Sequence, residues 1–315
     1  MNDLPVIVFH QLELRLAYIR AALTIDTLDA IGARGGPLKP VASGVYSISK
    51  PMLDAYKDGT YANHASNLGA LIADELAKEW NVPAYIVDPV TTDDFSPVAR
   101  ISGVPGIARK SRSHALNIKF CFHKACEQHD LSPEKAKFVI AHLGGGFSIA
   151  AVSGSKIIDV NDALLGMGPF SVNRAGSIPL AGLLSLVFDR KLSQSELELL
   201  FTSESGLQGY LGTSDFRKIE NQIDAGDETA KKVVNAMVYQ IAKEIGSCYA
   251  VLHGQVDGLI LTGGLAQSEF LMESIRKSIQ FIHPIIVYPG SFESEALAAG
   301  VRRVLNGEEN PKRYL

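Results

Sequence analysis

The feature that most constrains this chain is a run of three glycines between two apolar strands near its midpoint. Residues 137–143 predict a buried strand, Gly144, Gly145 and Gly146 predict a turn, and residues 148–152 predict a second strand. Such a turn either needs the positive φ that glycine supplies cheaply, or exposes backbone N–H groups that bind a phosphate. A helix after the turn would indicate a Rossmann unit, but a strand follows, and no Walker A pattern is present.

A second glycine turn favours the phosphate interpretation. Residues 257–264 predict a strand that ends at Gly263 and Gly264, and a helix is expected at 267–280. The N-terminus of a helix carries unpaired N–H groups and a dipole that favour an anion. Two such turns in one half of the chain make nucleotide binding a better interpretation than two structural turns. A strand, a glycine turn and a strand are also the phosphate-binding device of the actin, Hsp70 and sugar-kinase architecture.

Length and element order predict two α/β domains. The chain has 315 residues, and its predicted helices alternate with strands. A short strand is expected at 28–32, a third strand of the central meander at 156–160, and the longest helix at about 227–253. Residues 29–36 parallel residues 257–264, which indicates a duplicated domain. We place the first domain at 1–135 and the second domain, which contains both glycine turns, at 136–315.

Composition excludes several classes of protein. The net charge is -4 and no basic block stands out, so nucleic acid is not an expected partner. No apolar run is long enough to span a bilayer, and the apolar stretch at residues 5–9 lacks the basic segment of a signal peptide. Three cysteines indicate a reducing compartment. We therefore expect a soluble, cytoplasmic protein.

Further motifs carry a resemblance to a known family. They run in order along the chain at residues 63–69, 86–89, 142–148, 158–161, 168–171, 174–179, 210–217, 239–246 and 261–264. These segments resemble butyrate kinases of the acetokinase family. The resemblance implies duplicated actin-like (ASKHA, ribonuclease H-like) domains with a nucleotide cleft between them, the first domain on the acyl-substrate side and the second on the nucleotide side. It also implies transfer of the γ-phosphoryl of ATP to butanoate or a similar or branched short-chain acid, with Mg²⁺, by a homodimer or higher homo-oligomer. The products would be an acyl phosphate and ADP.

The chemistry requires cations, because the phosphoryl group and the carboxylate are both anionic and repel each other. Arg34 follows a strand end, and by resemblance it holds the substrate carboxylate or the phosphoryl group. Arg174 matches the family arginine that stabilises the transferred phosphoryl. His114 matches the family histidine that contacts the same group, and a histidine can donate to a phosphoryl oxygen without titrating. His64 is expected near the substrate.

Two carboxylates are expected at the metal ion. Asp88 ends a buried strand, where an ionised acid is costly unless it binds a cation or accepts hydrogen bonds. By resemblance Asp88 serves Mg²⁺ binding and catalysis, and Glu293 helps to hold the ion. Glu293 could equally be an acid that the dipole favours at a helix start, and Glu295 is close enough to exchange roles with it.

The nucleotide contacts are expected in the second domain. By resemblance they come from His142, from the two glycine turns, and from Asp215 and Arg217, which would contact the adenosine. Asp215 could also be the N-cap of a helix, and both roles could hold.

Four residues in a predicted helix have the composition of a zinc site. They are Cys121, His123, Cys126 and His129. On a helix these offsets point in widely different directions, since each residue turns the chain by about 100°. A buried helix face is therefore the better interpretation.

The chain departs from the family pattern at two places. The family's first phosphate-binding motif, a strand with an Asn-Pro-Gly-Ser turn, has no counterpart, and residues 1–10 align with the helix that follows it. The first domain is thus expected to be N-terminally incomplete. Leu165 and Met167 replace residues that are usually acidic in butyrate kinases. A late start codon, a degenerate paralogue or a partner chain that supplies the strand would each explain the first departure.

We expect low or absent kinase activity from these 315 residues alone, because one of the two phosphate-binding hairpins is missing. ATP-dependent formation of acyl hydroxamate from butyrate measures this activity, and robust turnover would contradict the expectation. The alternative function is a nucleotide-binding or regulatory protein without turnover. A sugar kinase is a third candidate, but it would need an aspartate base for a hydroxyl, whereas arginines and histidines dominate the motifs here.

Overall fold

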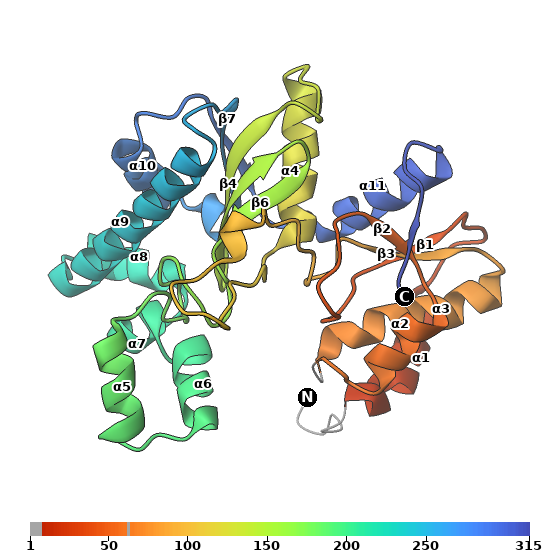
Figure 1. Ribbon diagram of the computed structural model, residues 1–315, viewed down its shortest axis with the longest axis horizontal. Helices are drawn as coiled ribbons and strands as arrows, with labels where there is room; N and C mark the ends of the chain where they lie inside the picture. Colours follow the sequence, from red (N-terminus) through yellow and green to blue (C-terminus); the bar gives the residue numbers. More distant parts are fainter. Residues whose placement is uncertain (1–7, 62–63) are drawn as a thin grey trace. The chain divides into compact units, whose positions relative to one another are not determined.

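The computed structural model describes residues 8–61 and 64–315, in which the chain forms two compact units (Figure 1). The first unit comprises Met1–Asp94, Ala115–Phe120 and Phe292–Leu315, and the second comprises Phe95–His114 and Cys121–Ser291. The units are therefore interleaved along the sequence. The domain boundary expected between residues 135 and 136 stays a prediction.

The first unit contains a four-stranded sheet in the order β1-β3-β2-β9. Its elements are η1 (Val8–Gln11), α1 (Leu12–Ala22), β1 (Ile31–Ala33), β2 (Val45–Ser47), α2 (Lys50–Lys57), η2 (Ala65–Asn67), α3 (Leu68–Trp80), β3 (Ala84–Val87), the start of α4 (Ala115–Gln128), α11 (Glu293–Leu305) and β9 (Lys312–Arg313). β1 and β3 are parallel neighbours, so their carboxyl ends meet at one edge of the sheet. β2 runs antiparallel to β3, and β9 runs parallel to β2.

Both faces of this sheet are covered, because successive side chains of a strand point to opposite faces. Ile86 of β3 packs in one cluster with Met52 of α2 and Ala70 of α3. Its neighbour Val87 packs in another cluster with Val301 of α11. The short β3 is therefore a central strand, which holds the residue that follows it in a fixed place.

The second unit contains a five-stranded sheet in the order β6-β5-β4-β7-β8. Its elements are η3 (Val98–Arg100), the rest of α4, β4 (Lys137–Leu143), β5 (Phe147–Ser153), β6 (Lys156–Val160), α5 (Leu180–Phe188), α6 (Gln194–Ser203), α7 (Gly206–Leu211), α8 (Phe216–Asp224), α9 (Glu228–Val251), β7 (Gly258–Gly263), η4 (Gly264–Gln267), α10 (Glu269–Ser278) and β8 (Ile285–Pro289). β4, β5 and β6 form the predicted antiparallel meander, and β4, β7 and β8 are parallel.

Strand β4 is apolar from Phe138 to Ala141, and both of its faces are buried there. Val139 belongs to a cluster that includes Met237 and Ile241 of α9. Phe138 instead meets Phe122 of α4 edge to face, with ring centroids 5.9 Å apart. Figure 1 shows α9 beside this sheet, with α10 next to it. A strand buried on both sides gives the turn that follows it a rigid support.

Several elements differ from those expected. The strand expected at residues 28–32 is β1, Ile31–Ala33, and β2, α2 and β9 were not predicted. Strands of two or three residues carry no periodicity of their own, and their pairing partners define them. The helix expected at 267–280 is α10, Glu269–Ser278, and η4, a 3-10 helix of four residues, lies between it and the second glycine turn. The second glycine turn therefore does not begin an α-helix, and the dipole argument for it is wrong.

The ends of β4 and β7 approach each other closely at Gly263. This glycine has φ 93°, and a Cβ atom built on it would lie 2.3 Å from the carbonyl oxygen of Leu143. Neither the conformation nor the space admits a side chain. The approach brings the two glycine turns to the same edge of the sheet.

Gly263→Ala should therefore lower the free energy of unfolding by about 2 kcal/mol or more, from backbone strain and overlap. Gly264→Ala is the matched control: a Cβ atom there meets nothing within 4 Å, and the effect should stay below about 0.5 kcal/mol. Urea unfolding of both variants measures the difference. Equal effects would contradict the close approach.

Candidate active site

The three glycines close the hairpin between β4 and β5. The two strands pair up to the turn, so Gly144, Gly145 and Gly146 alone form it. None of the three has a positive φ, so the interpretation as a turn that needs this conformation is wrong. Space explains Gly146 instead, because a Cβ atom built there would lie 1.9 Å from Nη1 of Arg174. The absent side chain leaves room for a guanidinium.

The loop that follows β6 holds Arg174 half-buried against this turn. Ser171 Oγ donates to the carbonyl oxygen of Gly145 at 2.6 Å, and the backbone N–H of Arg174 donates to Ser171 Oγ at 3.3 Å. Nη1 of Arg174 donates to the carbonyl oxygen of Ala163. Nε of Arg174 is buried and has no hydrogen-bond partner among the described residues. Burial lowers the pKa of the Arg174 guanidinium, and Asp162 offsets only part of this effect.

The carboxylate of Asp162 pairs with another arginine, Arg112. Nε of Arg112 donates to Asp162 Oδ2 at 2.8 Å. Arg174 itself forms no ion pair with a carboxylate within residues 8–61 and 64–315. Burying a cation, even in part, costs free energy when no anion pairs with it. An anion that binds beside Arg174 would offset this cost. The geometry therefore suits a phosphate at this turn.

Two histidines lie at the same turn. His114, at the N-cap of α4, stacks on His142 of β4 with ring centroids 4.0 Å apart and an interplanar angle of 11°. His142 is only 5% exposed, and a Cβ atom on Gly144 would lie 3.3 Å from its Nε2. Nδ1 of His114 lies 2.8 Å from Ser148 Oγ. The structure thus brings His114, His142 and Arg174 to the first glycine turn.

A hollow of about 360 Å³ joins the expected adenosine contacts to the second glycine turn. Asp215, Arg217 and Gly264 all line it. Asp215 is also the N-cap of α8, because its Oδ1 accepts the backbone N–H of Arg217 at 3.1 Å, which confirms the predicted cap. Nothing lies within 4 Å of a Cβ atom built on Gly264, so the backbone there faces open space.

In the first unit, Arg34 and Glu293 form an ion pair. Nη1 of Arg34 donates to both carboxylate oxygens of Glu293 at 2.9 Å. The two side chains are 44% and 41% exposed, so the pair contributes only about 0–1 kcal/mol to stability. The loop of Arg34 packs on the start of α3, since a Cβ atom on Gly69 would lie 2.3 Å from the carbonyl oxygen of Arg34.

Asp88 follows β3 and is deeply buried, with a positive φ of 38°. Its Oδ1 accepts the backbone N–H of Gly44 at 2.8 Å and Nζ of Lys119 at 3.0 Å. The side chains of Lys119 and Asp88 are only 8% and 3% exposed. The buried acid thus has both of the expected kinds of partner, a cation and a hydrogen-bond donor, and the cation is a lysine of α4.

The donor chemistry of Asp88 and Glu293 fits a hard cation. Mg²⁺ takes one or two carboxylates together with waters and phosphates, rather than a complete protein cage. Both contacts of Asp88 fall on Oδ1, so neither of them uses Oδ2. In the part of the chain that the structure describes, no group of three or more His, Cys, Asp or Glu side chains could hold a metal ion by itself.

His64 has a local role in the backbone. It is the N-cap of η2, where its Nδ1 accepts the backbone N–H of Ser66 at 3.2 Å and lies 2.7 Å from Ser66 Oγ. Its place near the substrate stays a prediction. Asn63, in the same motif, lies outside the described residues.

Three contact residues of the site were not singled out from the sequence: Lys119, Ser148 and Ser171. Lys119 lies between apolar neighbours on a buried part of α4, and a lone cation in such a position is a usable signal. Ser148 is part of the glycine motif, but its contact with a helix start depends on tertiary packing. Ser171 contacts the turn across 26 residues, and no periodicity marks it.

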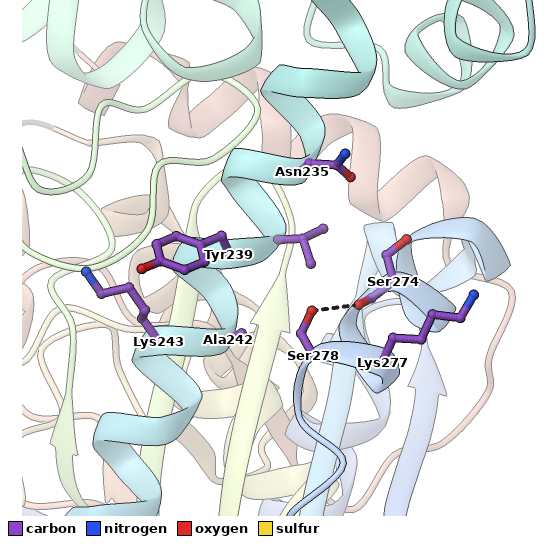
Figure 2. Close-up of a pocket in the computed structure, with 8 residues that line it drawn as sticks. Asn235, Tyr239, Ala242, Lys243, Ser274, Lys277 and Ser278 are labelled. Carbon is purple, nitrogen blue, oxygen red and sulfur yellow. Dashed lines mark hydrogen bonds between the residues drawn. The ribbon is translucent and has the colours of Figure 1, made fainter. Parts of the chain in front are cut away.

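Two further hollows contain no predicted site residue. One of them, about 600 Å³, lies between α9 and α10 and is shown in Figure 2. Tyr239 and Lys243 of α9 stand on one side, and Ser274, Lys277 and Ser278 of α10 stand on the other. A hollow of about 270 Å³ is lined by apolar residues that include Leu164, Leu165 and Met167.

No helix within the described ranges has the length and apolar character that crossing a membrane requires.

The fold class follows from solved structures. The crystal structure of Porphyromonas gingivalis acetate kinase matches with a TM-score of 0.80 at 23% identity, over 93% of this chain and 84% of that chain. A likeness at this level of identity shows the fold alone. It confirms the predicted α/β class and the duplicated actin-like architecture.

The family follows from sequence. Residues 105–283 match the Acetokinase family. "Probable butyrate kinase" of Listeria innocua is 48% identical over 290 residues, which are 92% of this chain and 82% of the relative. "Probable butyrate kinase 2" of Caldanaerobacter subterraneus subsp. tengcongensis is 46% identical over 312 residues, 98% of this chain and 88% of the relative. The chain belongs to the acetokinase family of carboxylate kinases.

The buried pair of Asp88 and Lys119 generates a stability prediction. Lys119→Met leaves an unpaired buried carboxylate and should lower the free energy of unfolding by about 3–5 kcal/mol. The double variant Asp88→Asn, Lys119→Met should lose clearly less, because no charge is left unpaired. Urea unfolding measures both. Lys50→Met, which breaks an exposed ion pair with Asp54, is the control and should barely move the midpoint. If the losses of unfolding free energy in Asp88→Asn and in Lys119→Met add up to the loss in the double variant, the pair is not formed.

Proposed function

We propose that the chain is a short-chain fatty-acid kinase that uses ATP and acts on butanoate or a similar or branched short-chain acid. Membership of the acetokinase family and relatives named as butyrate kinases support the proposal. The structural observation that carries it is the half-buried guanidinium of Arg174, which occupies the space left by Gly146 and has no carboxylate partner among the described residues.

In the proposed reaction, a carboxylate oxygen of the acid attacks the γ-phosphorus of ATP. The bond from that phosphorus to the bridging oxygen of ADP breaks, and ADP leaves with the electron pair. No proton needs to be removed, because the acceptor is already ionised. The reaction instead requires groups that stabilise negative charge on the phosphoryl oxygens. Permanently charged arginines and fixed N–H donors are such groups. Arg174 beside the glycine turn is such an arrangement, and we assign His114 as a further donor.

The nucleotide is proposed to bind the second unit. We assign its phosphates to Gly144, Gly145 and Gly146 with His142, and to Gly263 and Gly264 at the neighbouring turn. The adenosine is assigned to the hollow of Asp215 and Arg217, which reaches the second turn at Gly264. The common sheet edge of β4 and β7 and the continuity of this hollow support the assignment.

The carboxylates of the first unit are proposed to serve the metal ion. Asp88 and Glu293 would hold Mg²⁺, which neutralises charge on the phosphates when it is bound. Arg34 is assigned to the acid or the phosphoryl group, since its exposed pair with Glu293 is weak enough to exchange for another anion. His64 is assigned near the substrate. A homodimer or higher homo-oligomer is proposed from the resemblance, and a cytoplasmic location from the composition.

A nucleotide-binding protein without turnover is the second candidate. Such a protein would use the two glycine turns and the hollow at Gly264 in the second unit, and it would need no phosphoryl transfer. Calorimetry with ADP separates the two candidates, because nucleotide affinity without acyl phosphate formation would support this one.

Arg174→Ala should lower kcat by about 100-fold or more, since one preorganised charge partner of the transition state is lost. The measurement is hydroxylamine trapping of acyl phosphate, with acetate, propanoate, butanoate and 2-methylpropanoate as acceptors. Arg190→Ala is the matched control, because Arg190 is exposed and lies outside the assigned site. Unchanged turnover in Arg174→Ala, with the fold intact, would remove Arg174 from the mechanism.

A further inference from the structure

Ser148 and His142 hold the ring of His114 between them. The two residues face each other across the β4–β5 pair, so their side chains lie on the same face of the sheet. His142 stacks on the ring of His114, with centroids 4.0 Å apart, and Ser148 Oγ lies 2.8 Å from Nδ1 of that ring. Ser148 is fully buried, so water does not compete for its hydroxyl.

The hydrogen bonds at Ser148 Oγ determine which atom carries the proton. The backbone N–H of His114 donates to this oxygen at 3.2 Å, and a backbone N–H can only donate. If Nδ1 of His114 donated as well, the hydroxyl hydrogen would have no acceptor among the described residues, at a buried position where an unmade hydrogen bond is costly. The arrangement that satisfies every group has the hydroxyl donating to Nδ1.

We propose that Ser148 is a positioning residue that fixes His114 as the neutral tautomer with its hydrogen on Nε2. The neutral imidazole has one N–H, so an acceptor role for Nδ1 places the hydrogen on Nε2. Ser148 also fixes the ring orientation, because a half-turn of the ring would replace Nδ1 by a carbon and break the bond. His114 can then act as an N–H donor. The consequence for catalysis rests on the proposed function, whereas the tautomer does not.

The tautomer can be measured directly by two-bond ¹H–¹⁵N correlation of the histidine side chains in the full ¹⁵N-labelled chain. A pH of about 8 keeps ordinary imidazoles neutral. His114→Gln identifies the signals of His114 among those of the eight histidines. The wild-type chain should show the Nε2–H tautomer at His114. A wild-type spectrum with the hydrogen on Nδ1 would overturn the proposal, whatever the variants do.

Variants of Ser148 test the cause of the tautomer. Ser148→Ala should shift His114 toward the Nδ1–H form, and Ser148→Thr, which keeps the hydroxyl, should retain the wild-type pattern. Ser153→Ala, on the same strand, is the matched control and should leave the spectrum unchanged. An unchanged His114 spectrum in folded Ser148→Ala would assign the tautomer to another contact and overturn the role of Ser148.

Kinetics then connect the tautomer to the reaction. Ser148→Ala should lower kcat by about tenfold, with little change in KM for ATP, and Ser148→Thr should restore most of it. If the wild-type chain shows the Nε2–H tautomer and no turnover with any acid, the proposed function fails while the role of Ser148 in setting the tautomer stands. A tautomer shift in an active chain without loss of kcat would limit Ser148 to a structural role.

Discussion

The second unit depends on the parallel pairing of β4 with β7. This pairing runs to His142 and Thr262, and beyond it the backbone of Gly263 comes so close to Leu143 that no side chain fits. Two glycine turns therefore end at one edge of the sheet. The residues of the candidate site are arranged around this edge: the stacked histidines and Arg174 at the first turn, and the hollow with Asp215 at the second.

How far the sequence predicts this arrangement depends on the length of each element. The strands β4, β5 and β6 and the helix α9 are long, strongly patterned and bounded by turns or caps, and their predicted positions are confirmed. β2 and β9 have three and two residues, and only their pairing partners define them. The motifs identified the glycines and Arg174, but not the reason for Gly146. That reason is the volume of a side chain 28 positions away, which no local pattern records.

The charged residues assigned to the site have different partners in the two units. In the first unit, the acids assigned to the metal each have a cation of the chain, Lys119 for Asp88 and Arg34 for Glu293. In the second unit, the cation assigned to the phosphoryl group, Arg174, is half-buried and donates to the carbonyl oxygen of Ala163. The sequence identified four of these five residues as site candidates. It did not reveal Lys119, because the pairing of a helix residue with a strand end 31 positions away is set by packing.

The degree of burial determines how much free energy each of these charged groups loses when it exchanges its partner. The pair of Arg34 and Glu293 is two-fifths exposed, so water replaces a lost partner and the exchange costs little. The pair of Asp88 and Lys119 is almost completely buried, and separating it would leave an uncompensated charge at a cost of several kcal/mol. Arg174 has no carboxylate to release among the described residues, so binding of an anion there stabilises it without breaking an ion pair. Of these three cations, Arg174 and Arg34 are therefore the ones that we propose as partners of anionic ligands, while Lys119 holds Asp88.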